Sequence, residues 1–198
     1  MMSRVPVMIL FVVVAAVSSP WHALAGTPTD ELRTRIERIH QIVTAVDVRP
    51  EDRQAAIAAA DEVFDWPAIA QEVLGAQWEP RTPDEREEFT TLFAHFFALV
   101  FTAKAQFAQA DRFEFLGENI DGERAVVRTA AIKRQGGKRH VTYRMRRHGG
   151  ERWKVYSFDV EGMSLIDNYG AQFQQILKRG SYGDLAKRLR DISAALEK

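Results

Sequence analysis

The sequence contains no cysteine among its 198 residues. Disulfide bonds, thiolate catalysis and cysteine metal sites are therefore excluded, so the fold must rest on its hydrophobic core. Net charge is also absent, because 27 basic residues balance 27 acidic ones. A general nucleic-acid binder needs many Lys and Arg side chains on phosphates, so this balance argues against nucleic acid as a partner. The chain is 46% hydrophobic and 27% charged, which excludes a disordered or low-complexity protein.

Short motifs that carry chemistry are missing as well. The sequence has no nucleophile elbow, phosphate loop or glycine-rich dinucleotide turn. After the N-terminal segment the histidines stand singly, at His40, His95, His140 and His148, with no pair at the spacing of metal ligands. We therefore expect no metal and no cofactor.

Long hydrophobic runs are limited to the N-terminus, where residues 1–25 have the features of a secretory signal peptide. Residues 5–17 form an uncharged, mostly apolar run of 13 residues after Arg4, too short for a bilayer core that needs about 20. Ala23 and Ala25 supply the small residues of a cleavage site. An uncleaved N-terminal anchor is the alternative. We predict cleavage, export of the mature chain, and a single domain at residues 26–198.

Apolar spacing and capping residues predict six helices, at residues 29–46, 50–63, 66–74, 83–108, 165–179 and 182–196. The fourth is the most informative, because six of the twelve Phe residues lie in it. At about 100° per residue, its apolar side chains cover an arc of roughly 200°, whereas a helix that rests on one surface needs little over 100°. This helix must contact apolar material on two sides.

Between the fourth and fifth helices the periodicity changes to that of strands. Residues 112–116, 125–133, 139–147 and 153–160 are β-like runs separated by Gly-containing turns. Short links make consecutive strands antiparallel. The prediction is an α+β fold: a curved antiparallel sheet of about four strands, with a long helix and several flanking helices that enclose an apolar pocket, as in the NTF2-like cone.

Charge is distributed unevenly along the neutral chain. Residues 133–154 contain nine basic residues and one acidic residue, whereas residues 47–88 contain twelve acidic and four basic ones. The basic segment is either a dock for anionic head groups or an acidic partner, or a solvated strand face. Lys104 lies near Phe97 on the helical wheel, and either meets a phosphate at the pocket mouth or extends to solvent.

One enzymatic interpretation remains from the residues alone. Asp159 lies in the last strand near Tyr143, and an Asp base beside a Tyr can abstract a proton next to a carbonyl when the pKa of the Asp is raised. An isomerase that acts on a hydrophobic substrate is therefore the alternative function. The other interpretation of Asp159 is that it caps or pairs locally at the end of a strand.

Three stretches resemble the MlaC family, the periplasmic phospholipid carriers of the Mla lipid-asymmetry pathway, also called toluene-tolerance auxiliary components of an ABC transporter. They are Phe64-Asp65 with Leu74-Gly75, Trp78 and Thr82-Pro83; Trp153-Lys154-Val155-Tyr156 through Val160-Glu161-Gly162-Met163 to Asn168-Tyr169; and Gly183-Asp184-Leu185. One departure is Gly170, where the family pattern has Arg. The resemblance implies a carrier and not an enzyme, with acyl tails buried between sheet and helices.

The resemblance also implies partners. These are a phospholipid cargo, an inner-membrane ABC transporter complex and an outer-membrane lipoprotein complex, with transient membrane contact and a monomeric carrier. Although each pocket residue by itself also suits a plain core, the excess of large apolar side chains requires a dense core or an occupant. The expected lipid-binding residues are Phe93, Phe96, Phe97, Val100, Phe101, Lys104, Val141, Tyr143, Met145, Val155, Met163, Tyr169 and Phe173.

Overall fold

The computed structural model describes residues 26–44, 50–103, 110–133, 136–147 and 152–197. The predicted signal peptide and residue Lys104 lie outside these residues. The helices are α1 (Pro28–Val43), α2 (Pro50–Val63), α3 (Trp66–Leu74), the short 3-10 helix η1 (Gly75–Gln77), α4 (Pro83–Ala103), α5 (Leu165–Arg179) and α6 (Tyr182–Leu196). The strands are β1 (Ala110–Asp121), β2 (Arg124–Lys133), β3 (Lys138–Arg146), β4 (Lys154–Val160) and β5 (Met163–Ser164).

Side-chain caps fix where the helices begin. The Asp65 carboxylate accepts from the backbone N–H of Ala68 at the start of α3. Ser164 accepts from Asp167 N–H at the start of α5. Such caps satisfy backbone donors that have no partner within the helix. The sequence prediction of helix starts is therefore confirmed at these two positions.

The sheet is a five-stranded antiparallel meander in the order β1-β2-β3-β4-β5. The α+β fold with a curved sheet is confirmed, with a two-residue fifth strand added by a tight turn at Glu161 and Gly162, both at positive φ. The first strand is longer than the predicted 112–116. Its register shifts between Phe115 and Gly117, so the side-chain alternation that marks a strand in sequence is broken there.

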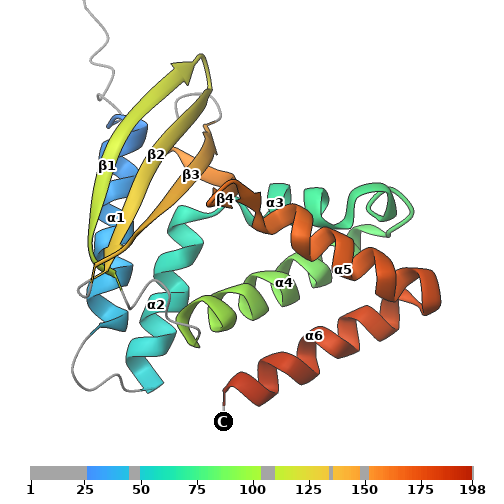
Figure 1. The fold of residues 1–198 in the computed structure, drawn as a ribbon. Helices are drawn as coiled ribbons and strands as arrows, with labels where there is room; N and C mark the ends of the chain where they lie inside the picture. Colours follow the sequence, from blue (N-terminus) through green and yellow to red (C-terminus); the bar gives the residue numbers. More distant parts are fainter. Residues whose placement is uncertain (1–25, 45–49, 104–109, 134–135, 148–151, 198) are drawn as a thin grey trace, which may run out of the picture.

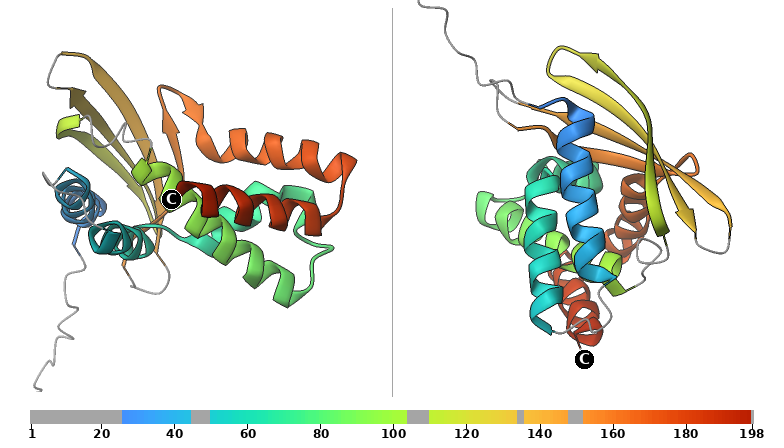
Figure 2. Two further views of the ribbon diagram at one scale, coloured as in Figure 1. Left: turned by 90° about the horizontal axis from the view of Figure 1, so that it is seen from below. Right: turned by 90° about the vertical axis from the view of Figure 1, so that its left-hand side faces the viewer.

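The helices are arranged unevenly around the sheet (Figures 1 and 2). Helix α1 packs on β1 and β2, whereas α2, α3 and α5 reach the sheet at β4. Helix α4 contacts α2, α3 and α6. The sheet thus lies at one end of the molecule, and α3 to α6 form a helical layer that continues beyond β4 (Figure 1).

The two-sided apolar character of α4 is confirmed by its neighbours. Phe97 packs on Phe64 and Phe158, which come from the end of α2 and from β4. Phe93, with none of its surface exposed, packs edge-to-face on Phe173 of α5. Aromatic pairs of this kind add to the free energy gained from burial of their apolar surface. Helix α4 therefore joins the core under the sheet to the core between the helices.

Gly170 brings α5 close to α3. A Cβ atom at this position would lie 3.2 Å from the carbonyl oxygen of Val73, which is closer than ordinary van der Waals contact. One turn further on, the Gln174 side chain donates to the carbonyl of Leu74 at 2.8 Å. The glycine that departs from the family pattern thus lies at a tight helix–helix contact.

Two charged contacts hold distant elements together. Arg35 of α1 is buried and donates to Glu31 at 2.6 Å and to the carbonyl of Trp153 at 2.7 Å. Arg146 of β3 donates to the Asp65 carboxylate at 2.6 Å. The second pair joins the basic strands to the acidic helical segment.

Candidate functional site

An apolar cavity of about 360 Å³ lies between the sheet and the helices, and we call it the sheet cavity. Strands β2, β3 and β4 line one side, and α1, α4, α5 and the end of α2 line the other. Its volume falls at the small end of the range for ligand pockets, about 300–1,000 Å³. The lining residues are Ile36, Phe64, Phe97, Val100, Ala131, Arg139, Val141, Tyr143, Phe158, Val160, Met163, Leu165, Asn168 and Tyr169.

The sheet cavity has a polar edge at Arg139 and Asn168. Arg139 is half-buried and is the one charged residue of the lining. Within the described residues its guanidinium has no hydrogen bond or ion pair. Met163, at the same edge, has 70% of its surface exposed. This edge is thus an open mouth with an unpaired cation and an exposed apolar side chain, a combination suited to an amphipathic ligand.

Six of the expected lipid-binding residues line the sheet cavity. They are Phe97, Val100, Val141, Tyr143, Met163 and Tyr169. The side chain of Phe101 and the whole of Lys104 lie outside the residues that the structure describes. Five further expected residues lie elsewhere.

Three of those five, Phe93, Met145 and Val155, are fully buried in the core and do not line the sheet cavity. Met145, near the end of β3, and Val155, near the start of β4, are cross-strand partners. Phe64 forms a parallel bridge with Val155, and Asp65 N–H donates to the Val155 carbonyl at 2.8 Å. The chain between α2 and α3 therefore closes this end of the sheet, which alternation along a strand cannot reveal.

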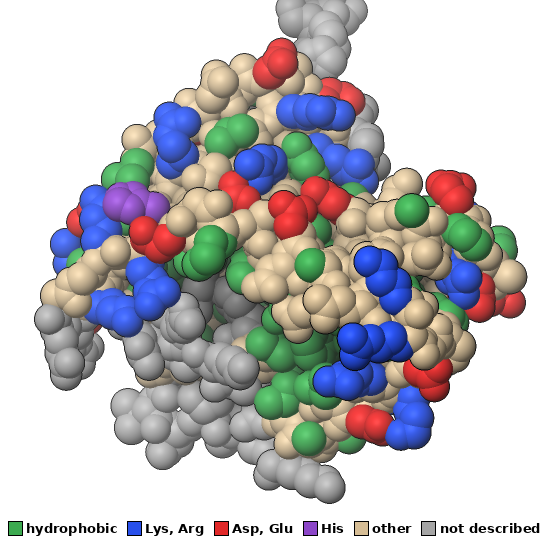
Figure 3. All heavy atoms as spheres, turned by 45° about the vertical axis from the view of Figure 1, so that its right-hand side comes forward, with side chains coloured by type: hydrophobic (Ala, Val, Ile, Leu, Met, Phe, Trp, Pro, Cys, Tyr) green, Lys and Arg blue, Asp and Glu red, His purple; other side chains and the backbone are tan. Residues whose placement is uncertain are grey.

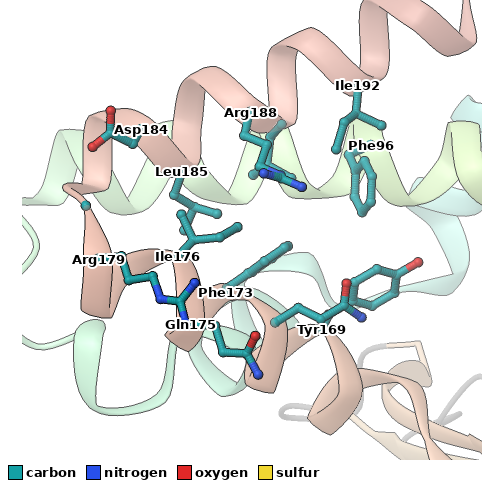
Figure 4. Close-up of a pocket in the computed structure, with 13 residues that line it drawn as sticks. Phe96, Tyr169, Phe173, Gln175, Ile176, Arg179, Asp184, Leu185, Arg188 and Ile192 are labelled. Atoms are coloured by element: carbon teal, nitrogen blue, oxygen red, sulfur yellow. The ribbon is translucent and has the colours of Figure 1, made fainter.

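The other two, Phe96 and Phe173, line a second cavity of about 560 Å³ between α5 and α6 (Figure 4). We call it the helix groove. It shares Tyr169 with the sheet cavity. The remaining lining residues are Gln172, Gln175, Ile176, Arg179, Gly180, Asp184, Leu185, Arg188, Leu189 and Ile192.

Sequence reasoning missed the residues of the sheet cavity that come from other elements, such as Ile36 and Arg139. Phe158 could have been found, because it pairs directly with Tyr143 across β3 and β4 and cross-strand partners share a face. Ile36 lies in the apolar stripe of α1, and only the packing of that helix on the sheet turns it toward the cavity.

Asp159 and Tyr143, the residues of the alternative isomerase, do not come together. Asp159 is the cross-strand partner of Thr142, and its carboxylate forms an ion pair with Arg144 at 2.8 Å. It therefore lies on the opposite face of the sheet from Tyr143. Burial raises the pKa of Tyr143 well above its usual range. The local ion pair, the other interpretation of Asp159, is the one observed.

Two further properties concern the part of the chain that the structure describes. No cluster of three or more His, Asp or Glu side chains in it could hold a metal ion. Nor is any helix there both long and apolar enough to span a membrane.

An α+β cone with an apolar cavity and a charged mouth defines a class of domains that bind apolar or amphipathic small molecules. The amino-acid sequence identifies the protein family within this class. The chain belongs to the MlaC family, whose sequence model, described as MlaC protein, matches residues 34–191. No curated protein sequence matches the chain.

A solved structure with a similar fold is that of a phospholipid-binding protein from Ralstonia solanacearum in complex with a phospholipid. The two chains align with a TM-score of 0.73 and 19% identity, over 87% of this chain and 100% of that one. The likeness confirms the predicted fold, and the family match confirms the resemblance drawn from the sequence.

Proposed function

We propose that this chain is a periplasmic carrier that binds one diacyl phospholipid in the sheet cavity and performs no covalent chemistry. The proposal rests mainly on the sheet cavity itself, which is apolar except for Arg139 and Asn168 at its mouth. The phospholipid bound to the structural neighbour supports it.

The energetics explain why a carrier is needed. Two acyl chains carry about 30 methylenes, and at about 0.8 kcal/mol each their exposure to water costs about 24 kcal/mol. A carrier must therefore cover most of the acyl surface. Because the sheet cavity of about 360 Å³ is small for a ligand pocket, we expect its walls to separate when both chains enter. Phe97, Val100 and Tyr169 would then contact the tails.

The head group would lie at the mouth, where the Arg139 guanidinium can donate to a phosphate oxygen. Charge-assisted hydrogen bonds of this kind are the stronger ones in proteins. Asn168, which also lines the cavity, supplies a neutral donor. Lys104, expected at the mouth from the sequence, remains part of this proposal.

The direction of transport would come from partners. Transfer of a lipid from a bilayer to an apolar cavity is close to thermoneutral, because both environments cover the same methylenes. We propose the partners implied by the family: an inner-membrane ABC transporter complex and an outer-membrane lipoprotein complex, each met with transient membrane contact. Cleavage after residue 25 would give a monomeric periplasmic domain of residues 26–198.

Native mass spectrometry of the purified protein, with organic extraction of bound molecules, tests the proposal. We expect one phospholipid per chain. Val100→Trp would place an indole ring in the sheet cavity and weaken phospholipid binding at least about tenfold, since even part of the tail burial exceeds the 1.4 kcal/mol that a factor of ten in affinity represents. Thr91→Trp, on the exposed side of α4, is the matched control and should retain the lipid.

An empty wild-type protein that also takes up no phospholipid from vesicles would contradict the proposal. So would full lipid occupancy in a folded Val100→Trp variant, with circular dichroism as the check of folding.

A further inference from the structure

The helix groove is apolar at its base and charged along its rim. Its base is formed by side chains from α4, α5 and α6: Phe96, Tyr169, Phe173, Ile176, Leu185, Leu189 and Ile192. Arg179, at the end of α5, and Arg188 of α6 stand on the rim, and both guanidinium groups point into the gap between the helices (Figure 4). Figure 3 shows hydrophobic side chains gathered in a hollow beside a group of Lys and Arg side chains.

The two rim arginines differ from their neighbours on α6. Lys187 pairs with Asp191 at 2.6 Å, and Arg190 pairs with Glu88. Arg179 and Arg188 have no hydrogen bond or ion pair within the described residues. On α6, Arg188 is thus the one cation without an anion among the described residues, and it is the one that lines the groove.

The single carboxylate of the groove is already engaged. Asp184 accepts from the backbone N–H and the hydroxyl of Ser181 in the capping box of α6, at 2.7 and 2.8 Å. The groove therefore offers two unpaired guanidinium groups above a continuous apolar surface. A ligand that complements both features has one anionic head and one apolar chain.

We propose that the helix groove is a second binding site, for an anionic single-chain amphiphile. The acyl chain lies along Ile176 and Ile192, the partly exposed apolar side chains of the groove, and a carboxylate or phosphate head lies between Arg179 and Arg188. Arginine suits this head because its planar fork donates two parallel hydrogen bonds to an oxyanion. This site goes beyond the proposed function, because the sheet cavity is separate and shares only Tyr169 with the groove.

Isothermal titration with four probes tests the proposal: palmitate, hexadecyl phosphate, hexadecanol and inorganic phosphate. The titrations use the purified protein and the Val100→Trp variant, in which an indole ring obstructs the sheet cavity. We expect one palmitate or hexadecyl phosphate to bind each chain in both proteins, and to bind at least about tenfold more tightly than hexadecanol or inorganic phosphate. The tighter of the two anionic probes identifies a fatty acid or a lysophospholipid head as the source.

The double variant R179Q/R188Q removes both rim charges, and K178Q/K187Q is its matched control. Lys178 and Lys187 are exposed, stand next to the rim arginines in the sequence, and do not line the groove. R179Q/R188Q should weaken binding of both anionic probes at least about tenfold, whereas K178Q/K187Q should leave it within about twofold.

Four results would overturn the proposal. The first is failure of both anionic probes to bind, and the second is loss of their binding in Val100→Trp, which would place them in the sheet cavity. The third is equal weakening of binding by the two double variants. The fourth is a change of oligomeric state in R179Q/R188Q, which would make the groove a contact between chains. Loss of diacyl lipid from Val100→Trp with palmitate binding retained would support both sites independently.

Discussion

The contact between α1 and the start of β4 gives the sharpest stability prediction. Arg35 and Glu31 lie one turn apart, with side chains only 10% and 13% exposed, and their charged groups are 2.6 Å apart. Glu31 also accepts from the backbone N–H of Trp153 at 3.2 Å, while Arg35 donates to the Trp153 carbonyl at 2.7 Å. Both charges are therefore satisfied by each other and by the same residue.

Removal of Arg35 leaves a mostly buried carboxylate without its cation. Loss of one partner of a buried pair costs about 3–5 kcal/mol, and we expect the lower end for Arg35→Met because the pair keeps some contact with solvent. Glu31→Leu should cost about 2–3 kcal/mol, and the double variant little more than Arg35→Met alone. The coupling energy is then about 2 kcal/mol.

The same helix carries a matched control. Arg33 and Glu37 have the same spacing, but their charged atoms are 4.0 Å apart and their side chains 44% and 48% exposed. The corresponding cycle with Arg33→Met and Glu37→Leu should give a coupling energy below about 0.5 kcal/mol. Free energies of unfolding from urea titrations measure both cycles. A coupling energy for the buried pair no larger than for the exposed pair would refute the reasoning.

Two further predictions concern the core and the pH dependence of stability. Phe93→Ala should lower the free energy of unfolding by about 3–5 kcal/mol, because the side chain is fully buried, whereas Val100→Ala, beside an existing cavity, should cost less. Equal losses in urea titrations would argue against the sheet cavity. Desolvation, and then the nearby carboxylates, raise the pKa of Glu72 above its usual 4.5. Ionised Glu72 therefore destabilises the fold, and stability is lost as the pH rises from 4.5 through the raised pKa. Glu72→Gln should raise Tm near pH 7 but not near pH 4; an equal rise at both would contradict this assignment.

The regular part of the fold could be predicted because local rules decide it. The caps at Asp65 and Ser164 mark helix starts, and the Gly-containing turns separate antiparallel strands. The apolar arc of α4 also predicted that the helix contacts apolar material on two sides. The bulge at Leu116 and the two-residue strand β5 were not predicted, because both depend on pairing with a neighbouring strand.

The lining of the cavities was predicted only in part, for a reason visible at Val155. The shifted register of β3 and β4 places Val155 on the same face of the sheet as Val141, yet Val155 pairs with Phe64 and is buried, whereas Val141 lines the cavity. Which apolar residues become core and which border empty space depends on elements distant in sequence. Arg139 was missed for the same reason, since its sequence neighbours mark it only as one of many basic strand residues.

Tyr169 lines both cavities and packs on Phe96 and Phe97, whose side chains line one cavity each. A ligand that displaces this ring from either side changes the space available on the other. Thermodynamic linkage then requires that the affinities of the two sites change by the same factor in both directions. Through this single aromatic ring, occupancy of one cavity would change the affinity of the other cavity for its ligand.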